Sequence, residues 1–216
     1  YKKLTDSMNP EIASEDLVDA ERITYKSYDG LEIPAIYYAT YHSDEDGVPA
    51  VVWVHGGPGG QARLRYSSFI QYLVNHGYDV LAVNNRGSSG YGREFYSLDD
   101  MKHGDADLKD CIAGKKWLVE TGRVAPDAVA IAGSSYGGFI VLAALTFAPD
   151  EFAVGVDIFG ISNWVRTLES IPSWWEAYRT ALYRELGDPE ADREYLRSIS
   201  PLFHAERIKK PLIVLQ

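Results

Sequence analysis

Short apolar runs rich in Val and Ile alternate with stretches of helical periodicity from Pro49 to the last residue. This alternation is typical of βαβ units, which build a mostly parallel sheet with helices packed on it. Five runs predict strands, at residues 50–54, 80–83, 129–132, 154–159 and 212–215. Each run is apolar enough to be covered on both faces. The sequence therefore predicts an α/β fold, with helices on both faces of a mostly parallel sheet.

Two of the segments between these runs carry helix signals. The first helix is predicted to start at residue 67 or 68, where a serine can cap it, with Phe69, Tyr72 and Leu73 on one face. The second is predicted to start at residue 105 or 107. Its apolar residues recur at helical spacing: Leu108, Cys111, Ile112, Leu118 and Val119.

The segment before Pro49 has a different pattern. Residues 23–28 and 33–38 flank Asp29 and Gly30, which predicts an antiparallel hairpin leading into the sheet. Residues 1–20 are predicted to be a connector or the tail of a preceding domain. The remaining residues, 21–216, are predicted to form the main domain. The chain has 216 residues and is 46% hydrophobic, enough to bury one full core. We predict one main globular domain.

The charge of the chain disfavours two classes of partner. The formal net charge is −10, so phosphate backbones and anionic lipid would be repelled. No apolar stretch in the sequence is long enough to span a bilayer. We therefore expect no nucleic acid partner and no membrane partner, and the sequence leaves the oligomeric state open.

The single cysteine, Cys111, rules out an internal disulfide and a multi-cysteine metal site. It is interpreted as a buried helix residue, and a lone cysteine is typical of a reducing compartment. We expect a cytoplasmic location on that ground. No other group of residues has metal-ligand spacing, so the sequence predicts neither a metal nor a cofactor.

The segment Gly-Ser-Ser-Tyr-Gly at residues 133–137 matches the pattern G-x-S-x-G. It lies between the predicted strand that ends at Ala132 and an apolar helix, which is the context of a nucleophile elbow. In such an elbow a serine sits at a strained turn, and small neighbours let strand and helix approach closely. Ser135 is the predicted nucleophile, because Ser134 would need a glycine where Ala132 stands. A chance glycine-serine turn is the alternative interpretation.

A second motif, His-Gly-Gly-Pro-Gly-Gly, follows an early strand at residues 55–60. Esterases and lipases place an oxyanion donor in such a turn and pair it with the N–H of the residue after the nucleophile. The predicted donors are Gly57 and Tyr136. A phosphate-binding loop is the alternative, but no Gly-Lys-Ser or Gly-Lys-Thr follows. His55 precedes the nucleophile in the chain. Proteins with a nucleophile elbow of this kind order their triad Ser, acid, His, so His55 is predicted to shape the turn.

Further segments occur in a characteristic order: Ser-Tyr-Asp-Gly-Leu-Glu-Ile-Pro at 27–34, His-Gly-Gly-Pro at 55–58, Asn-Asn-Arg-Gly-Ser-Ser-Gly-Tyr-Gly at 84–92, Ser-Tyr-Gly-Gly at 135–138, Ser-Pro at 200–201 and Lys-Pro-Leu at 210–212. Together they span nearly the whole chain and resemble the prolyl oligopeptidase family of serine peptidases, especially its acylaminoacyl-peptidase-like branch. The block at 84–92 is the most specific of them. The resemblance implies an α/β-hydrolase fold.

The resemblance also implies a β-propeller ahead of the catalytic domain, with residues 1–20 as the exit from it. Family members cleave oligopeptides or acylated peptides through an acyl-enzyme, and they differ in the residue accepted before the scissile bond. The specificity pocket is implied to follow the strand that ends near Phe159, where four aromatic residues occur: Trp164, Trp174, Trp175 and Tyr178. Trp175 falls where some members stack a ring on proline. Ordinary core or lid packing is the alternative for each ring.

In the family, the catalytic acid follows the last predicted strand and the catalytic histidine lies further on. The chain stops at Gln216, at the end of that strand, so we expect a fold incomplete at the C-terminus, with an apolar edge strand and the acid and histidine beyond Gln216. His204 is the one histidine after Ser135, but it precedes residues 212–215 at the opposite edge of the sheet. The two edges are roughly 15 to 20 Å apart, so His204 is predicted to be structural.

Three functions compete on these observations. The first is a serine peptidase in which Ser135 attacks, Gly57 and Tyr136 hold the oxyanion, and a histidine and an aspartate outside the 216 residues activate the serine. The second is a carboxylesterase on the same fold. The third is a non-catalytic binding domain that retains the fold without the triad. The intact elbow and glycine turn favour the first, with a short peptide as the expected partner.

Overall fold

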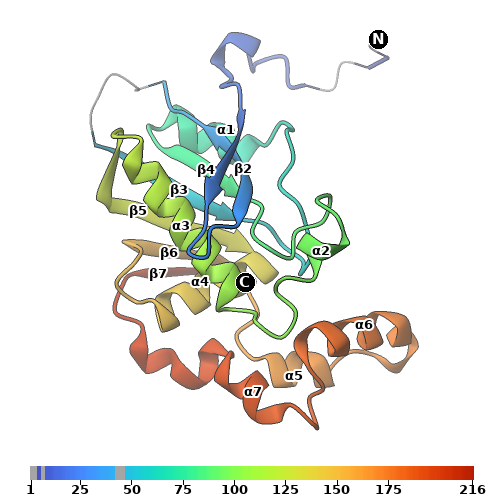
Figure 1. Cartoon of the computed structure of the whole chain (residues 1–216). Helices are drawn as coiled ribbons and strands as arrows, with labels where there is room; N and C mark the ends of the chain where they lie inside the picture. Colours follow the sequence, from blue (N-terminus) through green and yellow to red (C-terminus); the bar gives the residue numbers. More distant parts are fainter. Residues whose placement is uncertain (1–3, 6–7, 42–46) are drawn as a thin grey trace.

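The computed structural model describes residues 4–5, 8–41 and 47–216. These residues build a seven-stranded sheet with the order β1-β2-β4-β3-β5-β6-β7 (Figure 1). The strands are β1 Glu21–Lys26, β2 Glu32–Tyr38, β3 Val48–Val54, β4 Asp79–Val83, β5 Val124–Ser134, β6 Val154–Ile158 and β7 Leu212–Leu215. The five predicted runs are β3 to β7, and the predicted hairpin is β1 with β2. The fold class predicted from the sequence is confirmed.

The strands run in two directions. β1 pairs with β2, and β2 with β4, in antiparallel fashion, whereas the pairs from β4 through β7 are parallel. Parallel neighbours need crossover connections, which α1 Ser68–Asn75, α3 Ala106–Glu120 and α4 Tyr136–Phe147 supply. The loops after β3, β4, β5 and β6 therefore meet at one edge of the sheet.

Shorter helices complete the described part of the chain. They are α2 Arg93–Tyr96, α5 Trp164–Glu169, α6 Glu176–Leu186 and α7 Arg193–Ser198, with 3-10 helices η1 Ser14–Asp16, η2 Ser173–Trp175 and η3 Pro201–Arg207. In Figure 1, α5, α6 and α7 lie together beyond the β6 and β7 end of the sheet.

Both faces of the central strands are buried, because alternate side chains point to opposite faces. On β4, Val80 and Ala82 pack in the cluster that contains residues of α1. Leu81 and Val83 join the larger cluster on the other face, which contains residues of α3 and α4. Helices thus lie on both faces of the sheet, as predicted.

Helix α1 begins after Ser67, as predicted, but turns a different face to the core. Phe69 and Tyr72 are exposed. The buried side chains are Ile70, Gln71 and Val74. Gln71 is buried because its amide donates to the carbonyl and accepts the N–H of Val18, both at 2.9 Å. These two hydrogen bonds tie the incoming chain to the helix, while Ile70 and Val74 face the apolar cluster on the sheet.

Helix α3 confirms the predicted stripe, with Leu108, Cys111 and Leu118 buried. Trp117, which falls outside that stripe, packs edge-on against Tyr37 of β2 with ring centroids 5.3 Å apart. The hairpin therefore lies against α3 as well as on the sheet.

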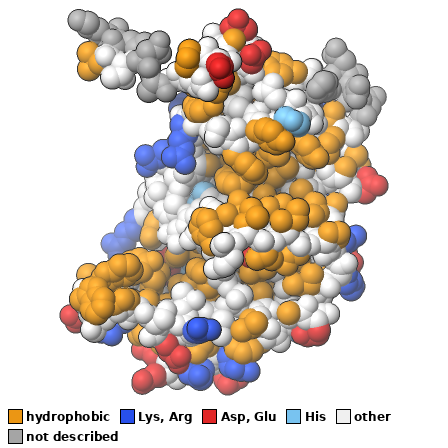
Figure 2. All heavy atoms as spheres, turned by 180° about the vertical axis from the view of Figure 1, so that it is seen from behind, with side chains coloured by type: hydrophobic (Ala, Val, Ile, Leu, Met, Phe, Trp, Pro, Cys, Tyr) orange, Lys and Arg blue, Asp and Glu red, His pale blue; other side chains and the backbone are white. Residues whose placement is uncertain are grey.

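The prediction that each strand is covered on both faces is wrong for β7. Ile213, Val214 and Leu215 are each at least 50% exposed. β7 is the last strand of the sheet order, and α1 packs on residues of β2, β3, β4 and β5 instead. Figure 2 shows a broad patch of hydrophobic side chains on the face seen from behind. β7 is thus the apolar edge strand that the sequence predicted.

Within the described ranges, no helix combines the length and the apolar composition that crossing a membrane requires.

Candidate active site

The turn between β5 and α4 holds Ser135 in a conformation that few residues adopt. Its φ is 56° and its ψ is −118°. A non-glycine residue at positive φ is strained, and such strain concentrates at functional sites. The side chain is partly exposed, and the Ser135 N–H donates to the carbonyl of Ile158 at 3.0 Å. The ends of β5 and β6 therefore fix this turn together.

Close packing accounts for the glycines on either side of Ser135. A Cβ on Gly133 would lie 2.6 Å from the carbonyl group of Gly137 and 2.8 Å from the carbonyl oxygen of Val54. A Cβ on Gly137 would overlap the same Val54 carbonyl. The first turn of α4 thus rests against the ends of β3 and β5. The prediction that small neighbours let strand and helix approach closely is confirmed.

The glycine turn after β3 borders Ser135. A Cβ built on Gly56 would be 3.3 Å from the carbonyl oxygen of Ser134 and 4.0 Å from Oγ of Ser135. Gly57 has a φ of 154°, and a Cβ there would come within 2.6 Å of the Gly59 nitrogen. The structure therefore brings the two predicted segments, the elbow and the glycine turn, together at one edge of the sheet.

His55 holds the glycine turn in place. Its Nδ1 lies 2.9 Å from the carbonyl oxygen of Gly56, and its Nε2 lies 2.8 Å from Oγ of Ser88. Burial lowers the pKa of the imidazole, so the ring is neutral at neutral pH. These contacts agree with the prediction that His55 shapes the turn.

Asn84 anchors the chain that leaves the glycine turn. Its Oδ1 accepts the N–H of Ala62 at 2.7 Å, and its Nδ2 donates to the Ala62 carbonyl at 3.1 Å. Ser88, from the same block, holds His55. The most specific motif of the sequence, residues 84–92, is therefore a scaffold for the turn beside Ser135.

Arg86, also in that block, forms a buried bridge between two distant segments. Its Nε and Nη2 donate to both carboxylate oxygens of Asp110 on α3, at 2.9 and 2.8 Å. Its Nη1 and Nη2 also donate to Asp29 in the hairpin turn, at 2.9 and 3.1 Å. Burial raises the pKa of Asp110, although hydrogen bonds from Arg86 and Ser27 oppose the shift. Arg86 thus locks the loop after β4 between α3 and the hairpin.

The side chain of Tyr136, the residue after Ser135, is held in a buried polar network. Its hydroxyl donates to Oδ2 of Asp107 and lies 2.5 Å from Nδ1 of His103. Burial lowers the pKa of His103 to about 4 and raises that of Asp107 to about 6. Neither His103 nor Asp107 belongs to a sequence motif that predicts this role, because their contact with Tyr136 joins segments that are distant in the chain.

In the described part of the chain, no histidine hydrogen-bonds to Ser135. His76 bonds to the carbonyl of Tyr72 at the end of α1, and His42 lies outside the described residues. His204 packs against Phe147, the last residue of α4, with ring centroids 5.6 Å apart. That residue is about 16 Å along the helix axis from the elbow. The distance agrees with the prediction that His204 is structural.

The aromatic residues after β6 divide into two groups. Trp164 is fully buried against Tyr136 and Phe139, with ring centroids 6.0 and 5.1 Å apart, so it belongs to the core under the elbow. Trp174 and Trp175 are exposed, and Trp175 packs edge-on against Tyr178. Only the exposed group remains free to meet a substrate.

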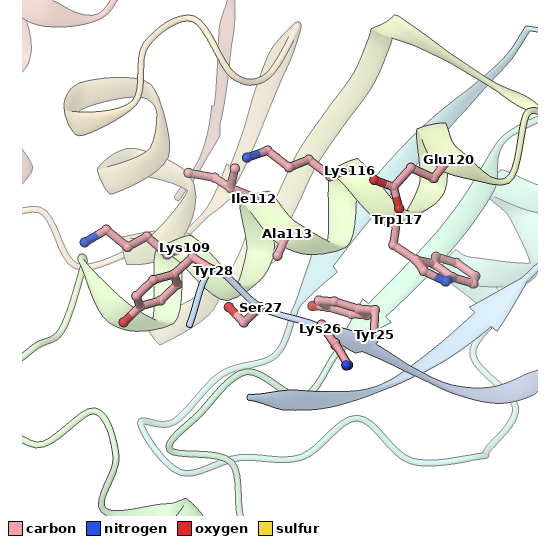
Figure 3. A pocket seen from close by; sticks show the side chains of 10 residues that line it. All are labelled: Tyr25, Lys26, Ser27, Tyr28, Lys109, Ile112, Ala113, Lys116, Trp117 and Glu120. Carbon is pink, nitrogen blue, oxygen red and sulfur yellow. The ribbon is translucent and has the colours of Figure 1, made fainter. Parts of the chain in front are cut away.

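A cavity of about 600 Å³ lies away from these residues, between β1 with the hairpin turn and helix α3 (Figure 3). Two of its lining residues, Tyr25 and Ser27, hydrogen-bond to Asp110 beside the Arg86 bridge. None of the predicted site residues lines it. The cavity is a groove left by the packing of the hairpin on α3.

The geometry defines a class of protein. A strained serine between a parallel strand and a helix, beside a glycine turn that follows a neighbouring strand, has the backbone geometry typical of the elbow turn in α/β-hydrolases. The sequence profile of the prolyl oligopeptidase family matches residues 64–216. The chain therefore belongs to the prolyl oligopeptidase family, as the resemblance implied.

Relatives with reported activities agree with this assignment. The chain is 39% identical to dipeptidyl aminopeptidase BIII of Pseudoxanthomonas mexicana over 216 residues, which are 99% of this chain and 30% of that enzyme. It is 30% identical to the acylamino-acid-releasing enzyme of Arabidopsis thaliana, over 85% of this chain and 25% of that enzyme. The structure of a puromycin-hydrolysing peptidase of Mycobacterium tuberculosis superposes with a TM-score of 0.88 at 28% identity, over 97% of this chain and 32% of that one. The chain thus spans about a third or less of these relatives.

Proposed function

We propose that the full-length protein is a serine peptidase that hydrolyses short peptides or acylated peptides through an acyl-enzyme on Ser135. The observation that carries the proposal is the strained, partly exposed Ser135 between β5 and α4. The glycines around this turn are closely packed, and a serine at such a strained strand-to-helix turn generally presents its hydroxyl clear of the sheet. Family membership and the peptidase names of the relatives support the same reaction class.

The oxyanion of the tetrahedral intermediate is proposed to be held by the N–H groups of Gly57 and Tyr136. Tyr136 is the first residue of α4, where N–H groups have no partner within the helix and the helix dipole favours negative charge. The hydrogen bonds of its hydroxyl to Asp107 and His103 keep the residue in one position. Preorganised donors of this kind are a large contribution to catalysis.

The general base and the acid that orients it are proposed to lie outside these 216 residues. A serine hydroxyl is a weak nucleophile unless a neighbouring base removes its proton. Among the described histidines, His55, His76, His103 and His204 are each engaged away from Ser135. A histidine and an aspartate elsewhere in the protein would complete the site.

The substrates are proposed to be short. The names of the relatives include a dipeptidyl aminopeptidase, acylamino-acid-releasing enzymes and a prolyl endopeptidase, all of which act on peptides or acylated amino acids. Trp175 is our candidate for a pocket residue, because it is exposed and pairs with Tyr178 at the start of α6. The buried Cys111 and the net charge of −10 support a reducing, cytoplasmic location without nucleic acid or membrane partners.

The full-length protein should release the chromophore from short peptidyl and acyl-aminoacyl p-nitroanilides and should leave a folded protein intact. Steady-state rates on a panel of such substrates, with a simple p-nitrophenyl ester for comparison, measure this. Hydrolysis confined to the ester would support the carboxylesterase instead. Efficient digestion of a folded protein would contradict the proposed size limit.

Gly57→Ala should lower kcat/KM by about 10²-fold, the usual effect of losing one oxyanion donor. An added Cβ would press on the nitrogens of Gly59 and Gly60 and displace the Gly57 N–H. The matched control is Gly122→Ala. Gly122 also has a positive φ, of 81°, but a Cβ there meets open space at the end of α3. Equal activity of the two variants would contradict the role of the Gly57 N–H as an oxyanion donor.

A further inference from the structure

Three buried side chains near Tyr136 bring possible metal-ligand atoms close together. Asp99 and His103 lie in the segment between α2 and α3, and Glu185 lies on α6. One ligand atom from each lies within 4.8 Å of the others. Asp99 is 1% exposed, His103 is fully buried and Glu185 is 9% exposed. Tertiary packing therefore brings together an imidazole and two carboxylates from distant parts of the sequence.

Each of the three residues has an unsatisfied polar atom. Oδ1 of Asp99, Nε2 of His103 and Oε1 of Glu185 have no hydrogen-bond partner. The His103 ring also lies within reach of the main-chain carbonyl of Glu185, which accepts the N–H of Met101 at 2.9 Å and keeps a second lone pair. Buried polar atoms normally have partners, and three such atoms in one cluster indicate a group that binds there.

The charge of the cluster indicates the sign of that group. In the described part of the chain, no lysine or arginine forms an ion pair with Asp99 or Glu185. Two carboxylates in a buried space need a compensating cation or a proton.

We propose that Asp99, His103 and Glu185 bind a divalent transition-metal cation of the zinc or manganese class. The ligand set of one imidazole nitrogen and two carboxylate oxygens suits these ions, whereas Ca²⁺ and Mg²⁺ prefer oxygen ligands alone. The spacing rules of sequence motifs do not reveal this site, since Glu185 comes from a separate helix.

A surface cavity borders one of the three residues. A cavity of about 530 Å³ lies between the α2 segment and α6, and Glu185 is one of its lining residues. A cation entering there would meet Glu185 first and then Asp99 and His103. Because His103 also contacts the hydroxyl of Tyr136, a bound ion would tie α6 to the turn that carries Ser135. The ion takes no part in the proposed attack by Ser135.

The test is calorimetric titration of Zn²⁺ and Mn²⁺ into the full-length protein after removal of metals with EDTA. We expect one Zn²⁺ per chain at this site, weaker binding of Ca²⁺ and Mg²⁺, and a rise in Tm of about 4 °C or more at saturating Zn²⁺. Glu185→Gln should weaken Zn²⁺ binding at least about tenfold, because loss of a ligand exceeds the usual cost of losing an outer-shell partner. Asp99→Asn provides a second variant with the same expected loss.

Glu176→Gln is the matched control, since Glu176 is an exposed glutamate on the same helix and the substitution changes the charge equally. It should bind Zn²⁺ like the wild type. Two results would overturn the proposal. One is a metal-free protein that takes up no cation, which would mean that a proton neutralises Asp99. The other is Zn²⁺ binding that survives Glu185→Gln and Asp99→Asn, which would place the ion elsewhere. Both readouts are independent of peptidase activity.

Discussion

Replacing Ser135 by alanine in the full-length protein should lower kcat by about 10⁵- to 10⁶-fold towards a chromogenic peptide. The loss should be this large because acyl transfer requires the Oγ atom itself, and the neighbouring Ser134 is the last residue of β5 rather than the residue at the strained turn. Activity should not reach zero. The oxyanion donors and substrate binding alone leave residual catalysis of about 10³- to 10⁴-fold over water in serine proteases that lack a triad member.

Labelling with a fluorophosphonate probe, followed by peptide mass spectrometry, tests directly whether Ser135 is the nucleophile. The probe should modify Ser135 in the wild type and nothing in the alanine variant. Ser134→Ala is the matched control, because Ser134 is the adjacent residue of the same motif and ends β5. Full activity in the Ser135 variant would contradict the assignment of Ser135 as the nucleophile. Loss of activity confined to the Ser134 variant would identify Ser134 as the nucleophile instead.

The second large effect concerns stability. Arg86→Met should lower the free energy of unfolding by about 3 to 5 kcal/mol, because it leaves the fully buried carboxylate of Asp110 without its cation. For a domain of this size the loss corresponds to a fall in Tm of about 10 °C. Arg86→Lys should recover only part of it, since an ammonium group cannot donate bidentately to both Asp110 and Asp29. Thermal unfolding followed by tryptophan fluorescence is the measurement.

Asp29→Asn serves as the comparison for Arg86→Met. Asp29 pairs with the same guanidinium, but its side chain is 40% exposed, and exposed ion pairs contribute about 1 kcal/mol or less. The double variant Arg86→Met with Asp110→Leu should be more stable than Arg86→Met alone, because both buried charges are then removed. If Arg86→Met unfolds at the wild-type temperature, Arg86 is not the anchor of the loop after β4.

Sequence patterns of a few residues predicted the structure correctly where the conformation depends on interactions between residues close together in the chain. Runs of Val and Ile predicted strands β3 to β7, and the glycines around Ser135 predicted a close strand–helix turn, because backbone strain and small side chains act over a few residues. The same logic failed for α1. Phe69 and Tyr72 belong to its apolar pattern, but both rings are exposed. The face on the sheet carries Ile70 and Val74, and the neighbouring Gln71 bonds to the main chain of Val18.

The roles of the histidines illustrate the same division. His55 was interpreted correctly as part of the glycine turn, since the motif that contains it is continuous. His103 has no motif, and only the structure places it against Tyr136. Among the aromatic residues after β6, Trp164 differs from Trp175 through burial, which depends on how α5 packs under the elbow.

By itself, the sequence determined the α/β class, the family and the position of the strained serine. Strand propensity, glycine placement and motif order each depend on residues that are close together in the chain. Only the tertiary structure decided which buried charges face one another. Arg86 meets Asp110 and Asp29, and Glu185 meets Asp99 and His103, across segments far apart in the chain. Burial makes such pairings strong, and burial is a property of the packed chain rather than of any short stretch of it.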